Sequence, residues 1–182
     1  MMFLFGCVLD EPIKEETKTC AACAGECLEE TMPATSASHV EGDLSYASYP
    51  PSSGDHNPCW STWGVFTEPV LPENFVHNLE HGGVVFIYDP TALEADLAAL
   101  TALVTAFPQG RAILTPASEP MAMKFAAVSW GHRVQLGCYD EAALSTFFWA
   151  NVGNAPEDVT SNPSSACTMQ DTGGDSGDTA AP

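Results

Sequence analysis

Side chains with metal-ligand spacing are concentrated between residues 39 and 81. Four of the five histidines lie in this interval, at His39, His56, His77 and His81. Within LPENFVHNLEHGG, His77 and His81 are four residues apart, which places both imidazoles on one face of a helix. Neutral imidazole is a good ligand for zinc and copper. The sequence therefore predicts a histidine metal site, with Glu80 as a further ligand or as the acceptor that fixes an imidazole tautomer.

The same residues permit two other interpretations. In a purely structural one, His77 and His81 bond to loop carbonyls at the helix end, and Glu80 accepts a backbone amide. In a catalytic one, the order His, two residues, Glu, His is typical of inverzincin peptidases, in which the histidines hold zinc and the glutamate acts as base. Those enzymes need a later carboxylate ligand. The glutamates downstream are Glu94, Glu119, Glu141 and Glu157.

Other residues bear on the choice of ligand. Copper is slightly favoured over zinc by the cell-envelope location expected below and by the soft side chains of Met121 and Met123, although core filling is the commoner role of methionine. Trp60 and Trp63 lie in a loop rich in glycine and proline, which also suits a non-catalytic module that binds a surface partner. Burial of that loop explains the same residues.

Composition limits the class of protein. A chain of 182 residues with 45 % hydrophobic residues has room for one domain with a core. Its formal net charge of −19, from 24 acidic against five basic residues, excludes an electrostatic grip on nucleic acid or on an anionic membrane surface.

The N-terminal MMFLFGC resembles the end of a bacterial lipoprotein signal, in which the cysteine is acylated. We therefore expect an exported protein of the bacterial cell envelope, periplasmic or on the cell surface, attached to the membrane only through lipid at Cys7. A frayed apolar terminus is the alternative. The other six cysteines are an even number, which in an exported protein predicts three disulfides with fifteen possible pairings. They are Cys20, Cys23, Cys27, Cys59, Cys138 and Cys167.

The periodicity of the chain predicts an α+β fold. We divide it into a signal remnant (1–7), an acidic cysteine-containing tether (8–38), a globular domain (39–153) and a low-complexity acidic tail (154–182). The domain opens with a long loop region (39–70) and a short helix that starts at Pro72 and ends at Gly82. After it, the order strand, helix, strand, strand, helix indicates a small mixed sheet with two packed helices. These elements are expected at 84–88, 91–107, 111–115, 121–135 with a turn near Gly131, and 140–153.

Several separate short motifs in the sequence resemble those of one family. They are YPPSSGDH at 49–56, Trp63–Gly64, VHNLEHGGVV at 76–85 and SWG at 129–131. Together they are similar to the family catalogued as domain of unknown function 3105, over roughly residues 39 to 150. The resemblance implies that His39, His56, His77 and His81 occupy positions of the family's motifs, and it implies no particular activity.

Overall fold

A computed structural model of the chain describes residues 16–34 and 36–163. The described part holds one sheet of seven strands and three α-helices, which confirms the α+β prediction. The strands are β1 (Glu16–Thr19), β2 (Cys27–Thr31), β3 (Gly64–Val65), β4 (Val84–Tyr88), β5 (Ala112–Pro116), β6 (Phe125–Ser129) and β7 (His132–Leu136). The helices are α1 (Pro72–Glu80), α2 (Glu94–Ala106) and α3 (Glu141–Asn151), with a 3-10 turn η1 at Ala22–Gly25. None of these helices is long and apolar enough to cross a membrane.

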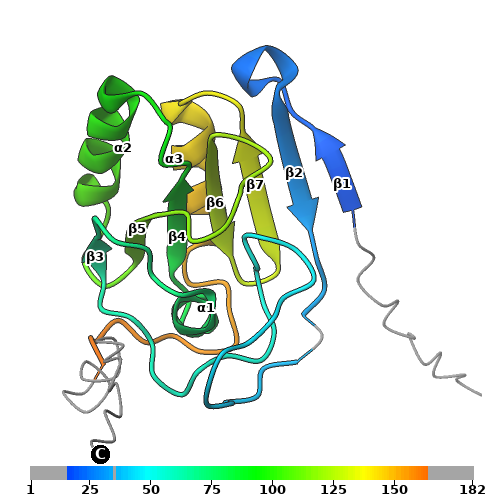
Figure 1. Cartoon of the computed structure of the whole chain (residues 1–182), viewed down its shortest axis with the longest axis vertical. Coiled ribbons are helices and arrows are strands. Elements are labelled where there is room, and N and C mark those ends of the chain that lie inside the picture. Colours follow the sequence, from blue (N-terminus) through cyan, green and yellow to red (C-terminus); the bar gives the residue numbers. More distant parts are fainter. Residues whose placement is uncertain (1–15, 35, 164–182) are drawn as a thin grey trace, which may run out of the picture.

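The sheet is mixed, with β4 near its centre. The spatial order is β1-β2-β7-β6-β4-β5-β3 (Figure 1). Strands β3, β4 and β5 run parallel, and α2 connects β4 to β5. The other neighbours are antiparallel. Every residue of β4 is buried, as expected for a strand covered on both faces.

Alternate residues of β4 face two different apolar clusters. Phe86 packs with residues of α2 and α3 on one face of the sheet, whereas Val85 and Ile87 pack with α1 on the other. In α1, the apolar side chains on this cluster are Phe75, Val76 and Leu79. The residues of α1 between them are left to face the loop that precedes the helix. Figure 1 shows α1 end-on beneath the strands, with that loop running around it.

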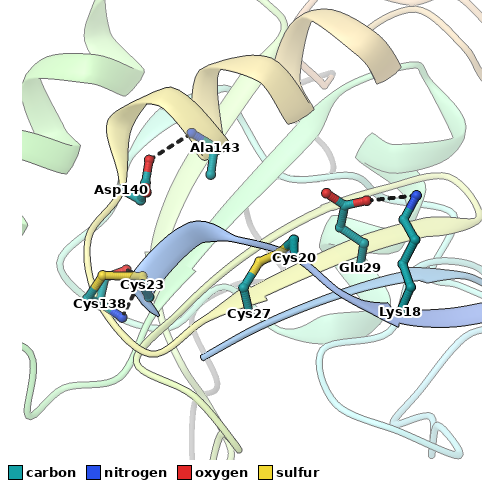
Figure 2. Close-up of a disulfide and its surroundings, with 8 residues drawn as sticks. All are labelled: Lys18, Cys20, Cys23, Cys27, Glu29, Cys138, Asp140 and Ala143. Carbon is teal, nitrogen blue, oxygen red and sulfur yellow. Dashed lines mark hydrogen bonds and ion pairs between the residues drawn. A yellow bond between two sulfur atoms is a disulfide. The ribbon is translucent and has the colours of Figure 1, made fainter. Parts of the chain in front are cut away.

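The predicted tether is wrong for residues 16–31. They form the hairpin β1–β2, and β2 pairs with β7 from Cys27 to Thr31. The sequence lacks apolar alternation here because β1 is an exposed edge strand. Such a strand gains its stability from pairing and cross-links rather than from a buried face. Lys18 and Glu29 form an ion pair across the hairpin (Figure 2).

Two disulfides hold this hairpin. Cys20 pairs with Cys27 inside it, and Cys23 pairs with Cys138 in the loop after β7 (Figure 2). Cys59 is also disulfide-bonded. Cys167 and the acylation candidate Cys7 lie outside the described residues.

Two other boundaries differ from the prediction. β6 starts at Phe125, so Met121 and Met123 belong to the loop before it rather than to a strand face. The segment expected to be a tail packs on the domain over residues 154–163. The remaining predicted strands and helices are found, and Asp140 caps α3 by accepting a hydrogen bond from Ala143 N at 2.9 Å.

Arg133 on β7 joins the sheet to the long loop. Its guanidinium group donates two hydrogen bonds to the carboxylate of Glu30 on β2, at 2.7 and 2.9 Å, and one to Pro50 O at 2.6 Å. Hydrogen bonding to Arg133 holds the pKa of Glu30 below its ordinary value. Arg133 is almost fully buried, so it depends on these partners.

Removing the Cys23–Cys138 disulfide should cost much more stability than removing Cys20–Cys27. The first closes a sequence separation of 115 residues and the second only seven. Chain-entropy estimates give about 5 kcal/mol for the long loop and about 2.5 kcal/mol for the short one. Urea unfolding of the two double alanine variants measures the difference. Equal losses would contradict the role of the long cross-link.

The Glu30–Arg133 pair should stabilise the fold at neutral but not at acid pH. Because the pKa of Glu30 is lower in the folded than in the unfolded chain, its contribution is complete above the unfolded value and is lost as pH falls through the folded one. We expect Glu30→Gln to cost about 3 kcal/mol at pH 7. The gap to the unaltered protein should close towards pH 3. Urea unfolding at both pH values tests this, with Glu29→Gln on the exposed Lys18 pair as the control that changes little.

Candidate metal centre

The centre is built on α1, which presents His77 and Glu80 on one side. Three residues apart on a helix, they are neighbours. Both are almost fully buried, at 3 % and 6 % exposure. The helix ends here because Gly82, with φ of +81°, takes the left-handed conformation that turns the chain into β4. Gly83 must lack a side chain, since a Cβ would lie 2.3 Å from the Trp63 ring.

Two asparagines of α1 clamp the preceding loop to the helix. The Asn78 side chain accepts a hydrogen bond from Ser61 N and donates one to Ser61 O, each at 2.9 Å. One turn earlier, Asn74 donates to Cys59 O at 2.7 Å. Asn78 is fully buried, so these bonds satisfy an amide that would otherwise be costly to bury. The prediction from sequence missed this pair, although their spacing of four residues is visible in NFVHN.

The loop that precedes α1 places His56 in the centre, facing the helix. Its ring is completely buried, and its Nε2 lies 3.0 Å from Glu80 Oε2. The backbone of Asn57 donates to Glu73 O at 2.8 Å, which fixes the loop beside the first turn of α1.

His39 reaches the same point from an earlier segment. A parallel bridge joins it to His56, in which Val40 N donates to His56 O and His56 N donates to Ser38 O. The His39 Nε2 lies 3.7 Å from Glu80 Oε2. Its side chain is 50 % exposed, so it forms the solvent side of the centre.

Together these four residues form a group able to hold a metal ion. Each of His39, His56, His77 and Glu80 offers one ligand atom, and these atoms all lie within 4.8 Å of one another. Zinc bonds to nitrogen and oxygen are near 2.1 Å, so two ligands of a tetrahedral ion are about 3.4 Å apart. The contacts of 3.0 and 3.7 Å to Glu80 bracket that separation.

Hydrogen bonds fix the tautomers of two rings. The Nδ1 atoms of His56 and His77 lie 2.9 Å from Gly54 O and 2.7 Å from Asn57 O. A carbonyl oxygen can only accept, so each Nδ1 carries the proton, and in a neutral ring each Nε2 then carries a lone pair. Burial lowers the pKa of His77 to about 3, which keeps that ring neutral at physiological pH. Backbone carbonyls orient metal-binding histidines in this way.

His81 lies beside this group rather than in it. Its ring contacts those of His77 and Trp60, with centroid separations of 4.4 and 4.7 Å. The Nε2 atom lies 3.2 Å from Glu157 Oε2. Burial lowers the pKa of His81, so this ring too favours the neutral form. That His81 binds the ion stays a prediction.

Glu157 is held in place by the segment 153–163, which runs across the end of α1. Backbone amides of this segment bond carbonyls at the helix end that have no partner within the helix. The three bonds join Gly153 N to Gly82 O, Glu157 N to Glu80 O and Val159 N to His81 O. Ser161 O accepts from both Trp60 and Trp63 indole groups, at 3.3 and 3.0 Å.

The remaining candidates lie elsewhere. Met121 and Met123 line a different pocket, beside Asp89 and Lys124, so they give no support for copper over zinc. His132 is on β7, 3.5 Å from Thr31 Oγ1, and takes no part in the group.

The structure thus defines a small α+β protein with a largely buried cluster of imidazoles and a carboxylate. The chain belongs to the family described as protein of unknown function (DUF3105), whose model matches residues 39–165. The match begins at His39 and spans every residue of the group as well as Glu157. No curated protein and no solved structure is significantly similar to the chain.

The tautomer of His77 can be tested directly in metal-free protein. We expect a neutral ring with the proton on Nδ1 down to about pH 4, because burial disfavours the charged form and Asn57 O accepts the Nδ1 proton. Long-range ¹H–¹⁵N NMR distinguishes the two tautomers and the imidazolium. An imidazolium spectrum for His77 at pH 6 would contradict this assignment.

Proposed function

We propose that this protein binds one divalent transition-metal ion, zinc or copper(II), through His39, His56, His77 and Glu80. The observation that carries the proposal is the contact between His56 Nε2 and Glu80 Oε2 at 3.0 Å. The other nitrogen of His56 is occupied by Gly54 O, so in the neutral ring two lone pairs face each other. They attract only when a cation lies between them, either a shared proton or a metal ion.

The donor set indicates the class of metal. Three imidazoles and one carboxylate are the ligands that zinc and copper(II) accept well, and the group contains no thiolate or thioether that would select copper(I). With neutral imidazoles the group carries a single negative charge. The net charge of −19 on the chain adds a field that concentrates cations around the protein.

We also propose that the protein is exported and anchored through lipid at Cys7. Disulfides persist in oxidising compartments, so the bonds Cys20–Cys27 and Cys23–Cys138 support an extracytoplasmic location. The lipid anchor depends on the likeness of MMFLFGC to a lipoprotein signal.

The geometry favours metal binding over peptidase chemistry of the HxxEH type. In that chemistry the glutamate is free to act as base and both histidines hold the ion. Here Glu80 contacts two imidazoles as a ligand would, so it is not placed as a free base. A surface-binding role for the two tryptophans gains no support, because both indole N–H groups bond Ser161 O within the domain.

Metal titration of His56→Ala tests the proposed function. Loss of a buried ligand should weaken zinc or copper(II) binding by more than about 100-fold, since even residues that only orient a ligand affect affinity by 10- to 100-fold. Competition with a chromophoric chelator and the metal content of purified protein measure this. The matched control is His132→Ala, a histidine outside the group, which should bind as the unaltered protein does.

Two results would overturn the proposal. One is an unaltered protein that takes up no zinc or copper(II) at neutral pH. The other is an equal affinity in His56→Ala and His132→Ala, which would place any bound ion elsewhere.

A further inference from the structure

The structure assigns to His81 a place as a further ligand of the same ion, bound through Nδ1, with Glu157 as the carboxylate that orients it. This inference rests on the proposed metal site and adds one ligand to it. It also makes the segment 153–163 part of the metal centre.

The hydrogen bonds of His81 follow the pattern of the other two buried rings. In His56 and His77 the Nδ1 atom is bound to a carbonyl oxygen, which leaves Nε2 as the nitrogen with a lone pair for an ion. In His81 the nitrogen next to an acceptor is Nε2, 3.2 Å from Glu157 Oε2. A carboxylate accepts the Nε2 proton, so in the neutral ring Nδ1 carries the lone pair.

That lone pair is the unusual feature. The Nδ1 atom of His81 is buried and has no hydrogen-bond partner among the described residues. The side chain is only 3 % exposed, so water does not readily supply one. A buried acceptor without a partner costs free energy unless it binds something, and a metal ion satisfies it.

The position of the ring suits this role. Its centroid is 4.4 Å from that of His77, closer than the 4.7 and 4.8 Å at which His39 and His56 lie from the same ring. His81 therefore packs against His77 as tightly as the members of the group do. His81 is not among the four residues whose ligand atoms lie within 4.8 Å of one another, so its side chain must rotate towards that group to bind the ion.

Backbone hydrogen bonds hold Glu157 in the position from which it orients His81. Its amide bonds Glu80 O at 3.0 Å, so the residue that orients His81 is tied to a ligand of the ion. Next to it, Asp158 forms an ion pair with Arg111 at 2.6 Å, which anchors the segment independently of His81. An imidazole that donates to a carboxylate is also a more basic metal ligand than one that donates to a carbonyl group.

The test compares Glu157→Gln with Asp158→Asn in the full chain, using Co²⁺ and Zn²⁺ as probes. Glu157 is 52 % exposed, so glutamine should leave the fold intact. We expect Glu157→Gln to weaken Zn²⁺ binding by about 10- to 100-fold and to change the visible absorption of bound Co²⁺, because an altered His81 changes the ligand field. Asp158→Asn removes the same charge one residue away and should leave both the affinity and the spectrum unchanged, because three backbone hydrogen bonds still hold the segment on α1.

The outcomes separate this inference from the proposed function. Unchanged Zn²⁺ affinity and Co²⁺ spectrum in Glu157→Gln, with binding retained, would overturn the role of His81 alone. An equal loss in Asp158→Asn would also overturn it, because the effect would then come from the segment and not from the carboxylate. Absence of binding in the unaltered protein would instead show that the proposed metal site itself is wrong.

Discussion

The contact between His56 and Glu80 is the constraint on which the arrangement of this protein depends. A fully buried imidazole and a nearly buried carboxyl group at 3.0 Å need a shared proton or a metal ion between them. The two residues come from a loop and a helix 24 positions apart. Neither element can therefore move away from the other without leaving a polar group buried and unpaired.

The rest of the fold keeps these elements together. The amides of Asn74 and Asn78 fasten the loop to α1, and Phe75 and Leu79 bury the opposite side of the helix on the sheet. The helix thus has two faces with different tasks, one apolar and one polar. Arg133 extends the connection by joining the same loop to β7 and, through Glu30, to β2.

Much of the sheet and helix content is predictable from sequence because it rests on local patterns. The apolar run 84–88 predicts β4, and the alanine-rich helical pattern that follows it predicts α2. The hairpin at 16–31 is not predictable in this way. Its strands are polar, and it joins the sheet through the pairing of β2 with β7 and through the Cys23–Cys138 disulfide, two long-range contacts that spacing alone does not reveal.

The site was only partly predictable from sequence, because part of it also depends on long-range contacts. His77 and Glu80 share a helix, so their proximity follows from helical geometry, and the concentration of histidines pointed to His39 and His56. The role of Glu157 was hidden, because an acidic residue in a polar terminal segment has no periodic pattern to place it. It contacts His81 only because backbone amides of its own segment complete the hydrogen bonds of the α1 terminus.

The unequal burial of the ligands bears on how an ion would enter and leave. His56, His77 and Glu80 are enclosed, whereas His39 is half exposed and reaches the group on a segment that leads from β2. Met32 N bonds Gly131 O and Ser38 N bonds Asp55 Oδ1, so this segment is attached at both ends, and the disulfides fix the hairpin from which it starts. In the proposed site an ion would exchange with solvent on the side of His39, because that imidazole is the exposed member of the group of four. The covalently fixed hairpin thus limits how far His39 can move away from the group.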